Sequence, residues 1–428
     1  LIFLFLGGFM IALAMEKWNF HKRLALWIIN AMGTDPKRII LGFMIATAFL
    51  SMWISNTAST MMMFPVAMAV VRQIALDASL NGERSFESQE KIENGLGLVL
   101  MLGLAYSASI GGVGTPIGTP PNIVFAGFYK NLFPGNPKIS FFQWMTMALP
   151  IVLVFIPLTW IYLCRFVSPF PIHHIEGGES EIIQKELDGW GSMSRAENIV
   201  AAAFCMTTAL WIFRRPILIG DFILPGWSSV FENPKYLHDS TVAMAMGILL
   251  LVFPVNGSKG LSVNGKIEKF ALDWKTVQSK MPWGILILFG GGFALAAGFG
   301  VSGLDKWIGS RFTGLSDWPL WLTILVICLV VTFLTELTSN TTTTTMILPI
   351  LGMAAVAATV HPLYFMVPAT LAASFAFMLP VATPPNAIVI GSGWVSIPKM
   401  SRAGLILNLI GAGIVTTAVL VLVTRLLI

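Results

Sequence analysis

Two parts of this chain repeat each other. At a constant offset of 284 residues, and without a gap, Ser55-Asn56-Thr57 aligns with Ser339-Asn340-Thr341. Around these triplets, 8 of the 17 positions in 49–65 are identical in 333–349. Such self-similarity is the signature of duplication, and both copies are expected to adopt one structure.

A second motif is also duplicated. The run Pro116 to Asn122 aligns with Pro380 to Asn386 at an offset of 264, and both runs contain Thr-Pro-Pro-Asn. The offset is 20 residues shorter than the first one. A polar connector at 77–93 of the first copy, nearly absent from the second, accounts for the difference.

Composition places these repeats in a membrane. Of the 428 residues, 56% are hydrophobic and only 11% are charged, against about 25% charged in average globular proteins. A helix crossing the bilayer needs about 20 apolar residues. Runs of that kind fall at about 1–15, 95–129, 143–164, 196–213, 239–255, 283–300, 361–395 and 402–427. No stretch has the basic pattern of a nucleic-acid-binding surface.

The spans predict an all-α polytopic membrane protein with inverted repeats. The second repeat, 196–428, contains five full crossings; an odd number makes the two repeats face opposite ways, as in many secondary transporters. The first repeat, 1–166, lacks counterparts of two spans, so we expect about 90 residues to be missing upstream. A connector at 167–195 separates the repeats.

The distribution of positive charge gives an orientation. Alternating the spans puts 18 of the 26 Lys and Arg residues on one side, in 16–38, 72–93, 165–195, 256–282 and 396–402. By the positive-inside rule this side is cytoplasmic and both ends of the sequence are external. We expect a multi-pass protein of a bacterial inner membrane. The segment Glu16 to Met32 is predicted to be an amphipathic helix on the cytoplasmic surface.

Polar clusters interrupt four apolar segments at matching places. Backbone broken within the bilayer is tolerated only where it lines a cavity or is buried in protein. We therefore expect two re-entrant helical hairpins, at about 37–75 and 319–358, whose second arms begin at the Ser-Asn-Thr triplets. Each triplet is followed by an apolar stretch that ends in a proline, Pro65 or Pro349. We expect two broken helices at about 95–129 and 361–395, with Thr as N-cap before the first Pro.

Four helix N-termini would meet near the midplane. Each carries about half a positive charge and free N–H donors, so together they could hold a dianion without Lys or Arg. Carbonyl, amide and hydroxyl oxygens at the same breaks suit a sodium ion. Either motif alone is usually a cap or a turn; their symmetric repetition favours a functional site.

Glu336 is the one carboxylate well inside an apolar run, and its counterpart in the first repeat is Met52. Intramembrane acids are functional candidates. Glu336 could bind a proton or a cation, or it could accept hydrogen bonds from the hairpin's backbone; we favour the second role slightly.

The duplicated Ser-Asn-Thr and Thr-Pro-Pro-Asn motifs resemble those of the divalent anion/sodium symporter family, and the apolar pattern extends the resemblance over nearly the whole chain. The resemblance implies a homodimer with a scaffold part and a mobile part that moves by an elevator-type mechanism. It also implies co-transported sodium at each hairpin tip, with the substrate between the tips. One ion would be bound by Ser51, Ser55, Asn56 and Gly118, and the other by Thr335, Thr338, Asn340 and Ala382. It places the substrate carboxylates against Asn56, Thr57, Thr119, Asn340, Thr341, Thr383 and Pro384.

These observations predict a sodium-coupled importer of C4 dicarboxylates such as succinate, malate or fumarate, with no organic cofactor. Two alternatives keep the fold: a dicarboxylate exchanger, or a carrier of citrate, sulfate or another oxyanion. A membrane enzyme is disfavoured because the spans contain no His or Asp, other than at their ends, for a catalytic pair. A channel is disfavoured because inverted repeats with midplane breaks suit alternating access.

Overall fold

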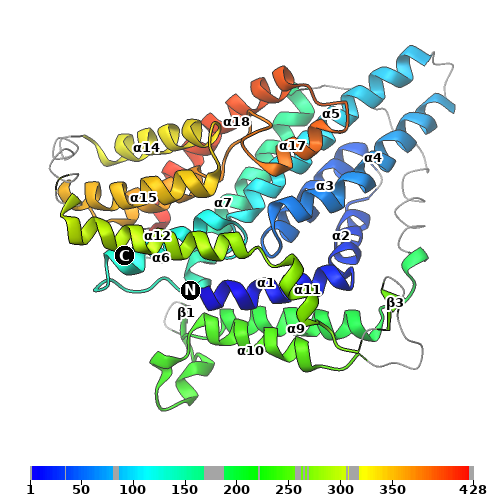
Figure 1. The fold of residues 1–428 in the computed structure, drawn as a ribbon. Helices are drawn as coiled ribbons and strands as arrows, with labels where there is room; N and C mark the ends of the chain where they lie inside the picture. The colour runs from blue at the N-terminus through cyan, green and yellow to red at the C-terminus, as the bar shows by residue number, and fades with distance from the viewer. Residues whose placement is uncertain are drawn as a thin grey trace. The chain divides into compact units, whose positions relative to one another are not determined.

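The computed structural model describes most of the chain, and the described part is mainly helical (Figure 1). The described residues are 2–33, 35–80, 86–167, 188–219, 222–255, 262–263, 266–267, 269–304, 307 and 318–423. They divide into two compact units. The smaller comprises Leu1–Arg23, Ser140–Phe142 and Trp190–Phe289, and the larger comprises Leu24–Ile139, Gln143–Gly189 and Gly290–Ile428.

The smaller unit is built on three apolar helices, α1 (Ile2–Lys17), α9 (Arg195–Ile212) and α10 (Asp239–Val252). Helices α1 and α10 pack together, and Gly7 lies so close to the backbone of Ala243 that a Cβ would not fit. Small residues at a crossing let two backbones approach, which is how apolar helices associate in membranes.

Polar contacts close the end of α1. Lys17 forms an ion pair with Asp273 at 2.8 Å, beside the short helix α11 (Trp274–Lys280), and Trp18 Nε1 donates to the carbonyl of Ala271 at 2.7 Å. Burial alone would raise the pKa of Asp273. Hydrogen bonds from Lys17 and Thr276 outweigh it and lower the pKa to about 2.

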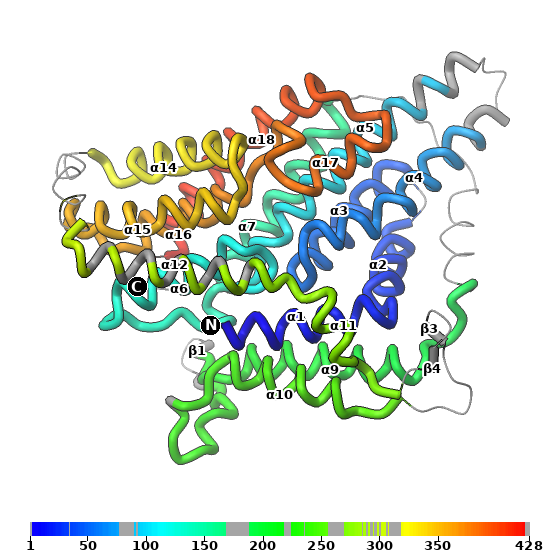
Figure 2. The backbone as a smooth tube through the Cα atoms, viewed as in Figure 1, coloured from blue at the N-terminus to red at the C-terminus, as the bar shows by residue number. Residues whose placement is uncertain are grey.

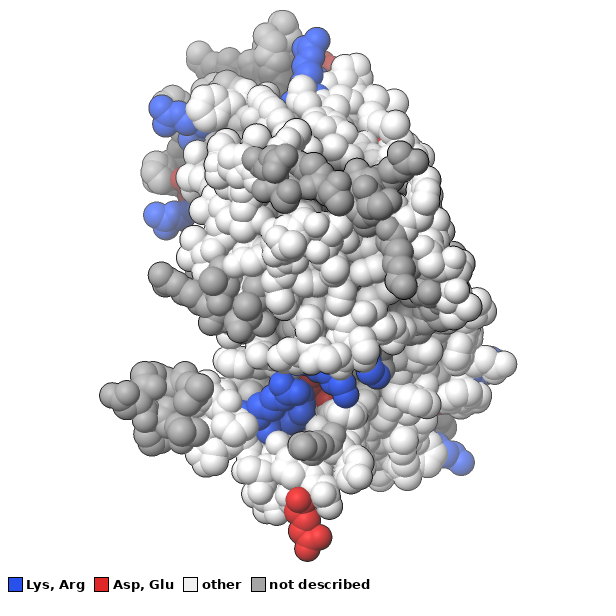
Figure 3. All heavy atoms as spheres, turned by 90° about the vertical axis from the view of Figure 1, so that its left-hand side faces the viewer, with Lys and Arg blue, Asp and Glu red and all other residues white. Residues whose placement is uncertain are grey.

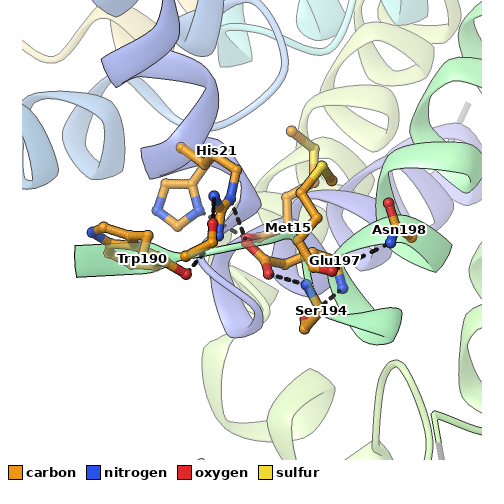
Figure 4. A network of polar contacts seen from close by, with 9 residues as sticks. Met15, His21, Trp190, Ser194, Glu197 and Asn198 are labelled. Atoms are coloured by element: carbon orange, nitrogen blue, oxygen red, sulfur yellow. Dashed lines mark hydrogen bonds and ion pairs between the residues drawn. The ribbon is translucent and has the colours of Figure 1, made fainter. Parts of the chain in front are cut away.

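A buried ionic network fixes the start of α9 (Figure 4). Arg23 Nε donates to Glu197 Oε1 at 2.9 Å, and its other guanidinium nitrogens donate to the carbonyls of Trp190 and Gly191. Glu197 Oε2 accepts from the Ser194 backbone N–H, while Ser194 Oγ accepts from that of Glu197. This capping box satisfies two donors that the first turn of the helix would otherwise leave unpaired.

Two short antiparallel hairpins occupy polar connectors of the smaller unit. β1 (Ile217–Ile219) pairs with β2 (Phe222–Leu224), and β3 (Ser262–Val263) pairs with β4 (Lys266–Ile267). Two 3-10 turns follow the first hairpin, η2 (Trp227–Val230) and η3 (Pro234–Tyr236).

The larger unit contains two helical hairpins. In Figure 2 the two arms of each hairpin lie side by side. The first pairs α3 (Pro36–Ser51) with α4 (Asn56–Leu80) and the second pairs α14 (Leu320–Thr335) with α15 (Asn340–Ala357). Asp35 caps α3 by accepting from the N–H groups of Lys37 and Arg38. Each second arm begins at the predicted asparagine.

Two broken helices complete the duplicated pattern. Helix α5 (Phe86–Gly112) is followed, after a break, by α6 (Pro120–Leu132), and α16 (Leu363–Ala372) is followed by α17 (Pro384–Ile390). Helix α6 packs on α15 of the second hairpin, and α17 packs on α4 of the first. This exchange brings each broken helix against the hairpin of the opposite repeat, which concentrates the helix breaks in one unit.

Long helices follow each break. Helix α7 (Phe141–Tyr162) ends in a π turn, η1 (Leu163–Val167), and α18 (Ile397–Ala418) ends in another, η5 (Val419–Val423). Buried aromatic rings pack where these helices meet the second break: Phe155 of α7 contacts Phe375 and Phe377 edge to face. Helix α12 (Trp283–Ser302) precedes the second hairpin.

The described helices are apolar enough for a membrane. Four of them have the length and hydropathy to cross a bilayer: Asn56–Leu76, Glu93–Gly112, Phe141–Val167 and Ile397–Val423. In the view of Figure 3, uncharged residues cover a broad area, and Lys and Arg gather in a few places beyond it. The protein is therefore an all-α multi-pass membrane protein.

One local prediction is corrected. The amphipathic helix α2 (Phe20–Ala31) begins four residues later than predicted, because α1 continues to Lys17 and Asn19 then adopts a positive φ of 55°. Pro65 and Pro349 lie inside α4 and α15, within the predicted hairpins. Proline is tolerated within membrane helices because neighbouring groups can satisfy the freed carbonyl.

Candidate functional site

The tip of the first hairpin gathers oxygen atoms from three segments. Ser51, the last residue of α3, places its hydroxyl 2.6 Å from Asn56 Oδ1 and 2.6 Å from the carbonyl oxygen of Ala108. A serine hydroxyl carries one proton, so it can donate to only one of these acceptors. Three oxygens that share one hydrogen are the kind of ligand set that a hard cation prefers.

The second hairpin repeats this arrangement. The hydroxyl of Thr335, the last residue of α14, lies 2.8 Å from Asn340 Oδ1 and 3.0 Å from the carbonyl oxygen of Ala373. Thr335 is the counterpart of Ser51, so hydroxyl, amide oxygen and carbonyl recur in the same relation. The predicted symmetry of the two tips is therefore present in the side-chain geometry as well as in the backbone.

An asparagine ties each break together. Asn122 Nδ2 donates to the carbonyl of Thr115 at 2.8 Å and lies within 3.4 Å of those of Val113 and Gly112. In the second break, Asn386 Nδ2 donates to the carbonyls of Leu379, at 2.9 Å, and Ala376, at 3.0 Å. Both asparagines are buried. Where the helix is unwound, the backbone carbonyls have lost their helical N–H donors, and each asparagine amide supplies a donor in their place.

The N-cap prediction holds in one break only. Thr383 precedes Pro384 and its hydroxyl accepts from the Asn386 backbone N–H at 3.3 Å. Thr119 occupies the same place before Pro120, but its side chain makes no capping hydrogen bond. Thr119 is nevertheless almost fully buried, with 2% of its surface exposed.

Glycines allow the first break to approach the hairpin tip. A Cβ on Gly112 would lie 2.5 Å from Asn56 Oδ1, and a Cβ on Gly118 would lie 2.9 Å from the carbonyl oxygen of Ser51. The Cβ on Gly118 would also collide with the carbonyl of Gly112. Only a residue without a side chain permits this contact, so the two glycines bring Gly118 within reach of the oxygens around Ser51.

Comparison with known proteins identifies the family. The model of the "Sodium:sulfate symporter transmembrane region" matches residues 1–427. The chain belongs to this family. It is 43% identical to the sodium-dependent dicarboxylate transporter SdcS of Staphylococcus saprophyticus over 99% of this chain and 76% of the relative. It is 42% identical to SdcS of Staphylococcus aureus strain RF122, over 98% of this chain and 75% of that relative.

Two solved transporters share the fold of this sodium:sulfate symporter family member at low identity. The YdaH transporter of Alcanivorax borkumensis superimposes with a TM-score of 0.61 at 11% identity, over 99% of this chain and 86% of that one. MtrF of Neisseria gonorrhoeae, described among antimetabolite efflux pumps, superimposes with a TM-score of 0.58 at 12% identity, over 97% of this chain and 79% of that one. These structures show the fold alone. The family and the relatives named above make the protein a transporter of the plasma membrane and not an enzyme.

The structure brings some of the residues expected from the family resemblance together and separates others. Ser51, Asn56 and Gly118 converge at the first tip, and Thr335 and Asn340 converge at the second. Ser55 is exposed at its tip and its hydroxyl instead accepts from the Ala58 backbone N–H. Thr338 is also exposed. Its hydroxyl forms hydrogen bonds with Thr343 Oγ1 and with the carbonyl of Leu334.

The remaining expected residues lie next to the hairpin tips or at the end of the second break. Thr57 and Thr341 are half-buried next to the tip asparagines, and Pro384 is exposed at the start of α17. Ala382 is buried, and its N–H donates to the carbonyl of Leu379 at 3.3 Å.

Sequence reasoning missed four contributors to the site: the carbonyls of Ala108 and Ala373 and the side chains of Asn122 and Asn386. The carbonyls of Ala108 and Ala373 gave no signal, because a backbone oxygen has no residue signature. Asn122 and Asn386 did give one: they end the duplicated Thr-Pro-Pro-Asn motif. Their amide nitrogens donate to carbonyls within the two breaks, 113–119 and 373–383, and so hold the unwound segments in place.

Proposed function

We propose that this protein imports C4 dicarboxylates, such as succinate, malate or fumarate, by sodium-coupled symport. The observation that carries the proposal is the doubled oxygen cluster: Ser51, Asn56 and the Ala108 carbonyl at one tip, and Thr335, Asn340 and the Ala373 carbonyl at the other. Two relatives named sodium-dependent dicarboxylate transporters, at 42–43% identity, support the same assignment.

The charges of the proposed site fit a dianion with sodium. The segments 51–57, 113–122, 335–341 and 376–386 contain no Lys, Arg or His. A bound dicarboxylate would therefore depend on helix N-termini and on the sodium ions for its counter-charge. Two sodium ions would neutralise two carboxylates, and the half-buried Thr57 and Thr341, with Thr119, Thr383, Pro384 and the tip asparagines, would supply its hydrogen bonds and contacts.

We propose the sodium ligands in two groups. The first group is Ser51, Ser55, Asn56 and Gly118; the second is Thr335, Thr338, Asn340 and Ala382. Ser51, Asn56, Thr335 and Asn340 have the strongest support, because their oxygens already face one another. Ser55 and Thr338 would have to turn from their present partners to join a bound ion.

The wider mechanism follows from the proposed repeats, 1–166 and 196–428 with the cytoplasmic connector 167–195. Inverted repeats support alternating access around a shared site. We propose that a mobile part carries the site across the bilayer as an elevator, and that a scaffold part forms a homodimer. The family model, whose description names sulfate, makes an oxyanion carrier the second candidate.

Uptake by proteoliposomes tests the proposal. Labelled succinate should accumulate when an inward sodium gradient is imposed and should not when choline replaces sodium. Competition by malate, fumarate, citrate and sulfate ranks the substrates. Equal uptake in sodium and choline would remove the coupling, and accumulation that requires internal dicarboxylate would indicate an exchanger. Displacement of succinate by sulfate at similar concentration would favour the oxyanion carrier.

A further inference from the structure

Glu336 is the only ionisable residue in the four segments that form the hairpin tips and the breaks, 51–57, 113–122, 335–341 and 376–386. It directly follows Thr335, and only 2% of its surface is exposed. A buried carboxylate is costly unless hydrogen bonds compensate for the lost water. Its surroundings therefore indicate why this position carries a charge.

Four N–H donors surround the Glu336 carboxylate. Oε1 accepts from the backbone N–H groups of Phe377, at 2.7 Å, and Met378, at 2.9 Å, and from Asn408 Nδ2 at 2.8 Å. Oε2 accepts from the Leu379 N–H at 3.0 Å. Carboxylates bind backbone N–H groups more strongly than neutral acceptors do. Glu336 thus binds the break between α16 and α17 and links it to α18.

The first repeat lacks this carboxylate and has a shorter break. Met52 occupies the equivalent position, and its side chain packs beside Gly114, the counterpart of Met378. Between α5 and α6 seven residues are non-helical, 113–119, whereas between α16 and α17 eleven are, 373–383. The longer break frees more backbone N–H groups, and Glu336 accepts from three of them.

Glu336 reaches the second oxygen cluster through Leu379. The N–H of Leu379 donates to Glu336, while its carbonyl accepts from the Ala382 N–H at 3.3 Å and from Asn386 Nδ2 at 2.9 Å. Ala382 is the proposed backbone ligand of the second sodium. The carboxylate also adds a negative charge near this cluster, and the first repeat has no counterpart of that charge.

We propose that Glu336 is a positioning residue for the second cation site and makes the two sodium sites unequal. It holds the turn that carries Ala382, and its charge gives the second site the higher sodium affinity. This inference rests on the proposed function, because it requires that the two clusters bind sodium.

Single-site variants test the inequality. Asn56→Ala disables the first cluster and Asn340→Ala disables the second, so each leaves one site to be measured by equilibrium binding of radioactive sodium to purified protein. The Asn56→Ala variant should bind sodium at least about fivefold more tightly than the Asn340→Ala variant, as a nearby carboxylate in a partly desolvated site would give. Adding Glu336→Gln should weaken sodium binding in the Asn56→Ala background and leave it unchanged in the Asn340→Ala background.

Controls separate this role from general stabilisation. Glu336→Asp keeps the charge with a shorter reach and should retain more sodium affinity than Glu336→Gln. It also serves as the second variant if Glu336→Gln does not fold. Thr417→Ala, an exposed change on α18, should alter neither site. An equal loss in both backgrounds, or equal effects of Asp and Gln, would overturn the inference. Absence of sodium binding by the unmodified protein would overturn the proposed function instead, and the inference with it.

Discussion

The hydroxyl of Ser51 lies 2.6 Å from the amide oxygen of Asn56 across the tip of the first hairpin. The two residues belong to different helices, α3 and α4, and the non-helical tip between them turns the chain back so that the side chains meet. The equivalent pair, Thr335 and Asn340, meets in the same way at 2.8 Å. A relation kept in both repeats, despite the change from Ser to Thr, indicates that the hydroxyl oxygen is what matters.

Removing either amide oxygen should abolish sodium-dependent uptake. Asn56→Ala or Asn340→Ala deletes one ligand of a proposed cation site and one contact to the substrate. Succinate uptake by proteoliposomes, with sodium and with choline, measures the effect. Asn198→Ala, at an exposed position of α9, is the matched control and should transport normally. Normal uptake by either tip variant would refute the assignment of that residue.

The hydroxyl of Thr335 should be required for sodium-dependent uptake, whereas its methyl group should not be. Thr335→Ser keeps the hydroxyl oxygen that faces Asn340 and Ala373. Thr335→Val keeps the shape of the side chain but loses that oxygen. We expect the sodium concentration for half-maximal uptake to rise about tenfold or more in the Val variant, since losing a buried polar partner costs about 1–3 kcal/mol. The Ser variant should stay near the wild type. If both variants behave alike, the hydroxyl is not a ligand.

A methyl group on Gly112 should disrupt the first site. Its Cβ would lie 2.5 Å from Asn56 Oδ1, so the asparagine must move away from Ser51. Gly112→Ala should lower sodium affinity more than it lowers the melting temperature. Gly413→Ala, in α18 where a Cβ meets nothing within 4 Å, is the control and should be neutral or stabilising by about 0.5–1 kcal/mol. Unchanged sodium dependence in Gly112→Ala would argue against this contact.

The buried pair Arg23–Glu197 should stabilise the smaller unit. Arg23→Met leaves the Glu197 carboxylate buried without its partner, which costs about 3–5 kcal/mol in comparable buried pairs. We expect a clear drop in melting temperature in detergent, with part of it recovered in the double variant Arg23→Met/Glu197→Met. Lys275→Ala, at an exposed position of α11, should have little effect. No recovery in the double variant would mean that the pair is not coupled.

Acid should weaken the same unit through His21. Burial is the main cause that lowers the pKa of His21 to about 4, and Lys22 and Lys280 lower it further, against the raising effect of the hydrogen bond to Met15. An unfolded histidine titrates near 6.5, so between about pH 6.5 and 4 the unfolded state binds more protons and the free energy of unfolding falls as the pH falls. The melting temperature should decrease over this window, and less so in His21→Gln. Identical profiles would exclude His21 as the source.

The sequence alone determined the membrane class, the duplication and the positions of the four interruptions. Hydrophobic run length and repeated polar motifs are local properties, and they set where helices must break because unpaired backbone is costly in lipid. The tip asparagines, Asn56 and Asn340, were identified for that reason. The family resemblance added Ser51 and Thr335 as their partners.

Only the tertiary structure decided which groups meet. The carbonyl of Ala108 belongs to α5, and that of Ala373 directly follows α16. Packing of α3 on α5 and of α14 on α16 brings them to Ser51 and Thr335. The role of Glu336 was likewise open until its N–H donors, more than 40 residues away, were located. Such contacts depend on how helices cross, and a residue pattern along one segment carries no information on the segment that packs against it.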